Sequence, residues 1–131
     1  MTIDRLSILQ DRMGRSYQEQ VWTVAVVGGV NGFVIGQATL LASVLGASAV
    51  IAGLSLIGFL ALLFLWSRHA IYRHYDGLLR ELISQGTDGR FFEFTRIQKL
   101  ARDLVGWSGI LLYSLITLAM TWASIAVIRN L

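Results

Sequence analysis

The sequence predicts an all-α membrane protein with three transmembrane helices, because two long stretches lack any charged side chain. The first stretch runs 48 residues from Gln20 to Ser67, and the second covers residues 104–128. A single helix of 48 residues would be about 72 Å long, more than twice the ~30 Å hydrocarbon core of a bilayer, so the first stretch has to turn back on itself. The small residues of Leu45-Gly46-Ala47-Ser48 mark the turn. The expected spans, within one membrane domain covering residues 1–131, are therefore 21–44, 49–67 and 104–128.

The distribution of lysine and arginine predicts the orientation of these spans. Three arginines precede the first span, seven basic residues lie between the second and third spans, one arginine follows the third, and the first hairpin turn has none. Because cytoplasmic loops carry the excess of Lys and Arg, the N-terminus and residues 68–103 are expected in the cytoplasm and the C-terminus outside. We expect an integral protein of the bacterial inner (cytoplasmic) membrane.

Residues 2–20 predict an amphipathic helix ahead of the first span. At 100° per residue, five apolar side chains share a face about 120° wide, with charged side chains opposite them. This apolar face comprises Ile3, Leu6, Leu9, Met13 and Tyr17. Such a helix lies on the membrane, packs against another subunit, or is a solvated lead into the first span, and the sequence leaves these three alternatives open.

The first span carries a glycine at every fourth position, at Gly28, Gly32 and Gly36. This spacing lets the backbones of helices in lipid approach closely. Further small or polar residues extend the same side of the helix, at Asn31, Thr39 and Ser43. The pattern predicts helix packing, either against the second span of the same chain or at a seam between subunits.

The helix of the second span is expected to continue beyond the membrane to about residue 84, where a loop with two glycines ends it. A short helix over residues 91–102 then precedes the third span. Together with the N-terminal helix, these segments predict a small helical collar in the cytoplasm. Basic and histidine side chains of the collar are expected to face anionic lipid headgroups: Arg68, His69, Arg73, Arg80, Arg96 and Lys99.

The third span carries a weakly polar stripe. Its members fall within about 120° of one another at 100° per residue. They include Gly109, Tyr113, Thr117, Thr121 and Ser124. Because no ionisable group lies on this stripe, a contact between helices is favoured over the wall of a pore, although both alternatives stay open.

Several functional classes are not expected. The chain has no cysteine, and none of its spans has an ionisable residue in its interior, which disfavours thiolate chemistry and proton-coupled transport. His69 and His74 point about 140° apart on one helix, so a single ion cannot take both. No nucleophile–base pair or phosphate loop stands out. The sequence thus predicts a non-enzyme without catalytic, cofactor-binding or metal site, and acidic loop residues argue against nucleic acid as a partner.

The order of these parts resembles that of two groups of small bacterial membrane proteins. The strings behind this impression are Glu19-Gln20-Val21-Trp22, Trp66-Ser67-Arg68-His69-Ala70-Ile71-Tyr72-Arg73 and Phe94-Thr95-Arg96-Ile97-Gln98-Lys99-Leu100. The layout is similar to octameric RipA-like membrane proteins and to SLATT-domain proteins, although SLATT proteins are generally built on two spans. The resemblance implies homo-oligomerisation with a membrane-perturbing or pore-forming role.

Two functions follow as expectations. The first is a homo-oligomeric inner-membrane protein that forms a pore or ring, with other copies of the chain and membrane lipids as partners. The second is a non-catalytic accessory or assembly subunit of a larger membrane complex. Charge, hydropathy and spacing do not separate these two.

Overall fold

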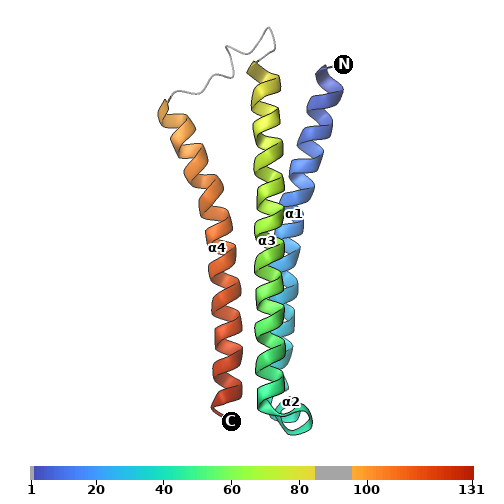
Figure 1. Ribbon diagram of the computed structural model, residues 1–131, viewed down its shortest axis with the longest axis vertical. Helices are drawn as coiled ribbons and strands as arrows, with labels where there is room; N and C mark the ends of the chain where they lie inside the picture. Colours follow the sequence, from blue (N-terminus) through green and yellow to red (C-terminus); the bar gives the residue numbers. More distant parts are fainter. Residues whose placement is uncertain (1, 85–95) are drawn as a thin grey trace.

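The computed structural model describes residues 2–84 and 96–131, which form three long helices and a short one (Figure 1). The elements are α1 (Thr2–Gly36), α2 (Ala38–Leu45), α3 (Ala47–Ser84) and α4 (Arg96–Arg129). The part of the chain that the structure describes contains no strand, so the prediction of an all-α fold is confirmed there. α1 and α4 run in the same direction and α3 runs opposite to both, with α2 at the end where α1 turns into α3 (Figure 1).

The described helices can cross a membrane two or three times by length and composition. α3 and α4 are each long and apolar enough on their own. α1 and α2 qualify together, as a pair bent by 81° at Gln37. The predicted first span, residues 21–44, is therefore interrupted at Gln37 rather than straight.

The bend at Gln37 keeps the backbone hydrogen bonds of a helix on both sides. The Gln37 amide donates to the Phe33 carbonyl (3.0 Å), and the Leu41 amide donates to the Gln37 carbonyl (2.9 Å). The second half of the reversal lies at Gly46, whose φ of +86° is a conformation that side-chain-bearing residues rarely adopt. α3 then begins at Ala47. The reversal is thus shared between two positions, of which the sequence pattern marked the glycine.

Two helices, α1 and α4, continue through boundaries that were predicted between separate helical segments. α1 runs without a break from Thr2 to Gly36, so the amphipathic segment and the start of the first span are one helix. α4 likewise continues from Arg96 into the third span. The chain has no proline to interrupt either helix. The extension of α3 reaches Ser84, and residues 91–95 of the predicted short helix lie outside the described residues.

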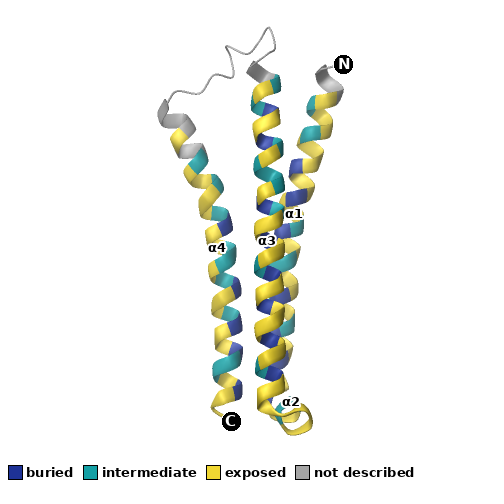
Figure 2. Cartoon of the chain, in the orientation of Figure 1, coloured by how far each residue is buried: buried dark blue, intermediate teal, exposed yellow. Residues whose placement is uncertain are grey.

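The apolar core lies at the α2 end of the bundle, where four elements meet. It is formed by Val34, Ala38, Val50, Leu54 and Ile128. Buried positions follow the inward faces of the helices, and the outward faces carry exposed side chains along their whole length (Figure 2). Many of the exposed side chains are large and apolar, including Trp22, Phe33, Leu115 and Trp122. Such an outer surface suits a lipid surrounding.

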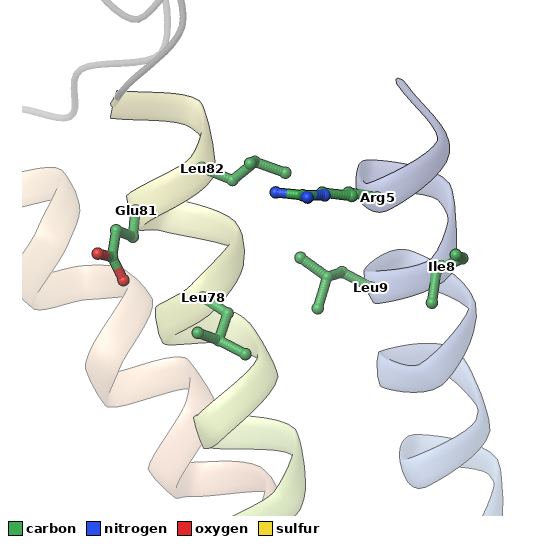
Figure 3. Close-up of a pocket in the computed structure, with 6 residues that line it drawn as sticks. All are labelled: Arg5, Ile8, Leu9, Leu78, Glu81 and Leu82. Atoms are coloured by element: carbon green, nitrogen blue, oxygen red, sulfur yellow. The ribbon is translucent and has the colours of Figure 1, made fainter. Parts of the chain in front are cut away.

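The apolar face of the N-terminal part of α1 packs toward α3. Met13 is buried, while Leu6 and Leu9 are half-buried. Beyond them the two helices separate and leave an open groove of about 310 Å³ between Leu9 on α1 and Leu78 and Leu82 on α3, with Arg5 at its rim (Figure 3). Packing against α3 of the same chain, which was not among the three alternatives for residues 2–20, is the arrangement observed over the described side chains.

Candidate functional site

Polar side chains are buried along the surface where α1, α3 and α4 face one another. They come from all three long helices and are Ser16, Gln20, Asn31, His69, Asp76, Thr117, Thr121 and Ser124. Buried polar groups are costly unless they find hydrogen-bond partners. The hydrogen-bond partners of these buried polar residues therefore show which helix faces already pack against other helices of the same chain.

Asn31 joins α1 to α4 in the middle of the uncharged region. The Ser124 hydroxyl donates to Oδ1 of Asn31, and Nδ2 of Asn31 donates to the Val27 carbonyl (2.8 Å). Both side chains are almost completely buried. This bond places Asn31 of α1 and Ser124 of α4 at the same level along the bundle.

The hydroxyl stripe of α4 also faces the interior of the chain. Thr117 donates to the Tyr113 carbonyl (2.9 Å), and Thr121 donates to the Thr117 carbonyl (2.8 Å). α3 approaches closely here, because a Cβ added to Gly58 would lie 3.0 Å from the Thr121 Oγ1 atom. Sequence reasoning missed Gly58, since a single glycine in an apolar helix gives no periodic signal.

The glycines of the first span differ in what they meet within the chain. A Cβ at Gly28 would contact Met120 of α4 at 3.5 Å, whereas a Cβ at Gly32 or Gly36 would meet no described atom within 4 Å. Thr39 and Ser43 are exposed as well. Only the Gly28 and Asn31 part of the predicted seam, among the described contacts, packs within the chain.

A second set of small residues forms a stripe on the outer face of α1, which we call the α1 groove. It consists of Ala25, Gly29, Gly32 and Gly36, all exposed, at successive intervals of four, three and four residues. At 100° per residue they fall within about 60° of one another, on the side opposite Asn31. Sequence reasoning had grouped Gly28 with this set in place of Gly29.

The outer face of α4 carries a complementary row of large side chains, which we call the α4 ridge. Its members are Leu111, Leu115, Leu118 and Trp122, with Leu104 in line beyond them. The intervals are again four, three and four residues, and the side chains share a sector of about 60°. All are more than half exposed. Groove and ridge thus have the same spacing and both face outward.

A cluster of ion pairs ties the helices together beyond the uncharged segments. Arg68 on α3 pairs with Glu19 on α1 (3.0 Å). Asp103 on α4 receives both Arg73 and Arg80 of α3 (3.3 Å each). The hydrogen bond from Arg73, followed by that from Arg80, holds the pKa of Asp103 below its usual range. Asp103 was not singled out from the sequence, because an acid beside Arg102 reads as ordinary surface charge.

The two histidines have different surroundings. His69 is buried between the rings of Trp66 and Trp107, with its ring centroid 5.2 Å from that of Trp107. Burial, followed by the charge of Arg73, lowers the pKa of His69. His74 is exposed and lies against Tyr75. Among the described residues no three potential ligands are grouped in a way that could hold a metal ion.

Two predicted residues of the basic face, Arg96 and Lys99, have side chains outside the described part of the structure. The others divide between ion pairs and the interior: Arg68, Arg73 and Arg80 are partly exposed, and His69 is enclosed. No known protein family, curated protein or solved structure matches this chain.

Proposed function

We propose that this chain assembles with copies of itself into a ring in the membrane, the α4 ridge of one protomer packing into the α1 groove of the next. The observation that supports this proposal is the α1 groove: four small exposed residues in a row, three of them glycines at which an added Cβ would meet no described atom within 4 Å. Helices in lipid gain little from hiding apolar surface, so their association depends on close van der Waals packing. A groove of glycines beside large apolar neighbours loses that packing unless another helix fills it.

The direction of the helices favours a ring over a closed dimer. α1 and α4 run the same way, so rotation about an axis along the membrane normal brings the α4 ridge of one protomer against the α1 groove of the next (Figure 1). All protomers then keep one orientation, for which we propose the cytoplasmic N-terminus that the basic residues predict. Two different faces in contact generate a head-to-tail assembly, which forms a ring when the rotation from one protomer to the next closes.

The polar groups favour a ring with an apolar or lipid-filled centre over an aqueous pore. Thr117, Thr121 and Ser124 are buried inside the protomer. Outward hydroxyls of the uncharged segments donate to carbonyls of their own helix, as Ser55 does to Ile51 (2.9 Å) and Ser108 to Val105 (2.8 Å). A conducting pore needs a polar wall. The proposed role is therefore assembly within the membrane, without catalysis.

The test uses the absence of cysteine from the natural chain. Asn31 and Ser124, which are 93 residues apart, bond to each other and so lie at the same level of α1 and α4. Ala25 and Leu118 are also 93 residues apart, so they too lie at one level. Variants Ala25→Cys and Leu118→Cys, expressed separately and then together, are oxidised in membranes and run on a non-reducing gel. We expect disulfide dimers only in the mixture, and a ladder of multimers from the double variant.

Leu63→Cys, an exposed position on α3, is the matched control in place of Ala25→Cys and is expected not to cross-link to Leu118→Cys. Cross-linking of Ala25→Cys with itself would show a contact between two α1 grooves and overturn the ring. A native mass equal to one chain would overturn assembly altogether. Co-purification of a different polypeptide at fixed stoichiometry would establish the accessory-subunit alternative instead.

A further inference from the structure

A cavity of about 190 Å³ lies between α1, α3 and α4 at the level where the uncharged segments end. α4 leans away from α3 toward its own N-terminal end (Figure 1). Polar side chains from α1 and α3 and two glycines of α4 line the cavity; among them are Tyr17, Gln20, Tyr72, Arg73, Asp76 and Gly109. Neither the ion-pair cluster nor the proposed ring uses this space.

Gln20 shows that the cavity is more than a packing fault. The residue is 3% exposed, and its amide has no hydrogen-bond partner among the described residues. Gln20 is among the residues that line the cavity. A buried amide in this state lacks the partner that its burial calls for.

The other polar groups of the cavity include hydrogen-bond donors on Arg73 and Tyr17 and one carboxylate, that of Asp76. Arg73 uses Nη1 to bond Asp103, which leaves its further N–H groups for another acceptor. The Tyr113 hydroxyl donates to the Tyr17 hydroxyl (3.0 Å), so the hydrogen of Tyr17 is still to be donated. The carboxylate of the cavity, Asp76, is held by Arg80 at 3.2 Å.

Two glycines of α4 keep the cavity open. A Cβ at Gly109 would meet no described atom within 4 Å, and a Cβ at Gly106 would lie 3.6 Å from Nη1 of Arg73. Any larger side chain at Gly109 would occupy the space itself. Since a water molecule occupies about 30 Å³ of liquid, the cavity has room for about six waters, or for a group the size of a phosphate with its first attached carbons.

We propose that this cavity binds a phosphate group, with Arg73, Gln20 and the tyrosine hydroxyls donating to its oxygens. Charge-assisted bonds from arginine suit phosphate. The level of the cavity, between the uncharged segments and the ion pairs, is that of lipid headgroups. Exposed Val105 on α4 offers an apolar surface beside it for acyl chains. The phosphate comes from a phospholipid or from free phosphate, and the test distinguishes these sources.

The experiment measures the thermal unfolding of the full chain in a phosphate-free non-ionic detergent. Three probes are titrated separately: dihexanoyl phosphatidylglycerol, dihexanoylglycerol without phosphate, and sodium phosphate. A ligand that binds the folded state alone raises Tm in a saturable way. We expect phosphatidylglycerol to raise Tm and dihexanoylglycerol to leave it unchanged. A response to sodium phosphate as large as that to the lipid identifies free phosphate as the source of the group.

The cavity-filling variant Gly109→Leu is expected to raise the phosphatidylglycerol concentration that half-saturates the Tm rise by at least about tenfold. Tyr72→Phe removes one hydrogen-bond donor without adding bulk and is expected to raise that concentration about threefold to tenfold. Gly53→Leu, at an exposed glycine of α3 with no described atom within 4 Å of an added Cβ, is the control and should respond as the natural chain does. An unresponsive natural chain would overturn the proposal. So would an equal response to dihexanoylglycerol, or a natural-strength response from both Gly109→Leu and Tyr72→Phe. None of these results depends on whether a ring forms.

Discussion

Two stripes of small and polar residues, one on α4 and one on α1, look alike in the sequence and behave differently in the structure. The α4 stripe faces inward: Thr121 packs against Gly58, and Ser124 bonds to Asn31. Most of the glycine-rich part of α1 faces outward, where Gly32 and Gly36 have no described neighbour. Small residues at helical spacing therefore indicate that a helix packs closely, but not which partner it packs against. Substitutions on the two stripes are therefore expected to differ in how much they change the stability of a single chain.

The largest effect is expected from Gly58→Leu, which places a side chain where a Cβ would already lie 3.0 Å from Thr121. Overpacking of this kind costs about 1–3 kcal/mol. The measurement is the free energy of unfolding in mixed micelles titrated with a denaturing detergent. Gly53→Leu on the same helix, exposed and without described neighbours, is expected to change little. Equal losses from the two variants would mean that α3 and α4 do not approach at Gly58.

A smaller effect is expected from the bond between Asn31 and Ser124. A double-mutant cycle of Asn31→Leu and Ser124→Ala should give a coupling energy of about 0.6–1.7 kcal/mol, the range of hydrogen bonds between helices in membranes. The same unfolding titration measures all four proteins. Additive single variants would show that the two side chains do not bond in the membrane.

The ion pairs of Asp103 are expected to contribute less, because Asp103 and both arginines are partly exposed and screened by water. The arginines lower the pKa of Asp103 in the folded state below its ordinary value of 3.8. Its stabilisation is thus fully present above pH 3.8 and is lost as pH falls further through the folded pKa. Thermal unfolding against pH should show a steeper acid decline for the natural chain than for Asp103→Asn. Identical slopes of Tm against pH for the two proteins would show that Asp103 forms no stabilising ion pair.

The smallest effect on a single chain, and the largest on assembly, is expected from Gly32→Leu. The added side chain enters open space on the outer face, so the free energy of unfolding of the protomer should stay within about 0.5 kcal/mol of the natural value. The same side chain blocks the α1 groove, so the native mass in mild detergent should fall toward one chain. If the variant keeps the native mass of the natural protein, the α1 groove is not part of the contact between protomers.

Much of the architecture was predictable because membrane insertion follows local composition. Uncharged length predicted the apolar helices, and the turn residue Gly46 was marked by its small neighbours. The bend at Gln37 was not predictable in this way, since neither proline nor a glycine pair marks it in the sequence. The continuity of α1 and α4 was missed because charged and uncharged stretches were read as separate helices.

The candidate sites were less accessible to sequence reasoning. Asn31 and the α4 hydroxyls stood out as polar residues in apolar helices, and these are buried together. Gln20 and Asp103 did not stand out, because at the edge of an uncharged segment a polar residue is unremarkable. Gln20 lines a cavity with Gly106 and Gly109, which are 86 and 89 positions away, and Asp103 bonds to Arg73, which is 30 positions away.

The sequence by itself determined that the chain is helical and long enough in apolar residues to cross a membrane, since both follow from properties of each segment alone. Only the tertiary structure decided which faces of those helices pack against other helices of the chain and which face outward. The rotation of each helix about its axis depends on the sum of many contacts with two others, and a turn of one residue, 100°, exchanges an inward glycine for an outward one. That rotation placed Gly28 against Met120 and left Gly29, Gly32 and Gly36 facing outward.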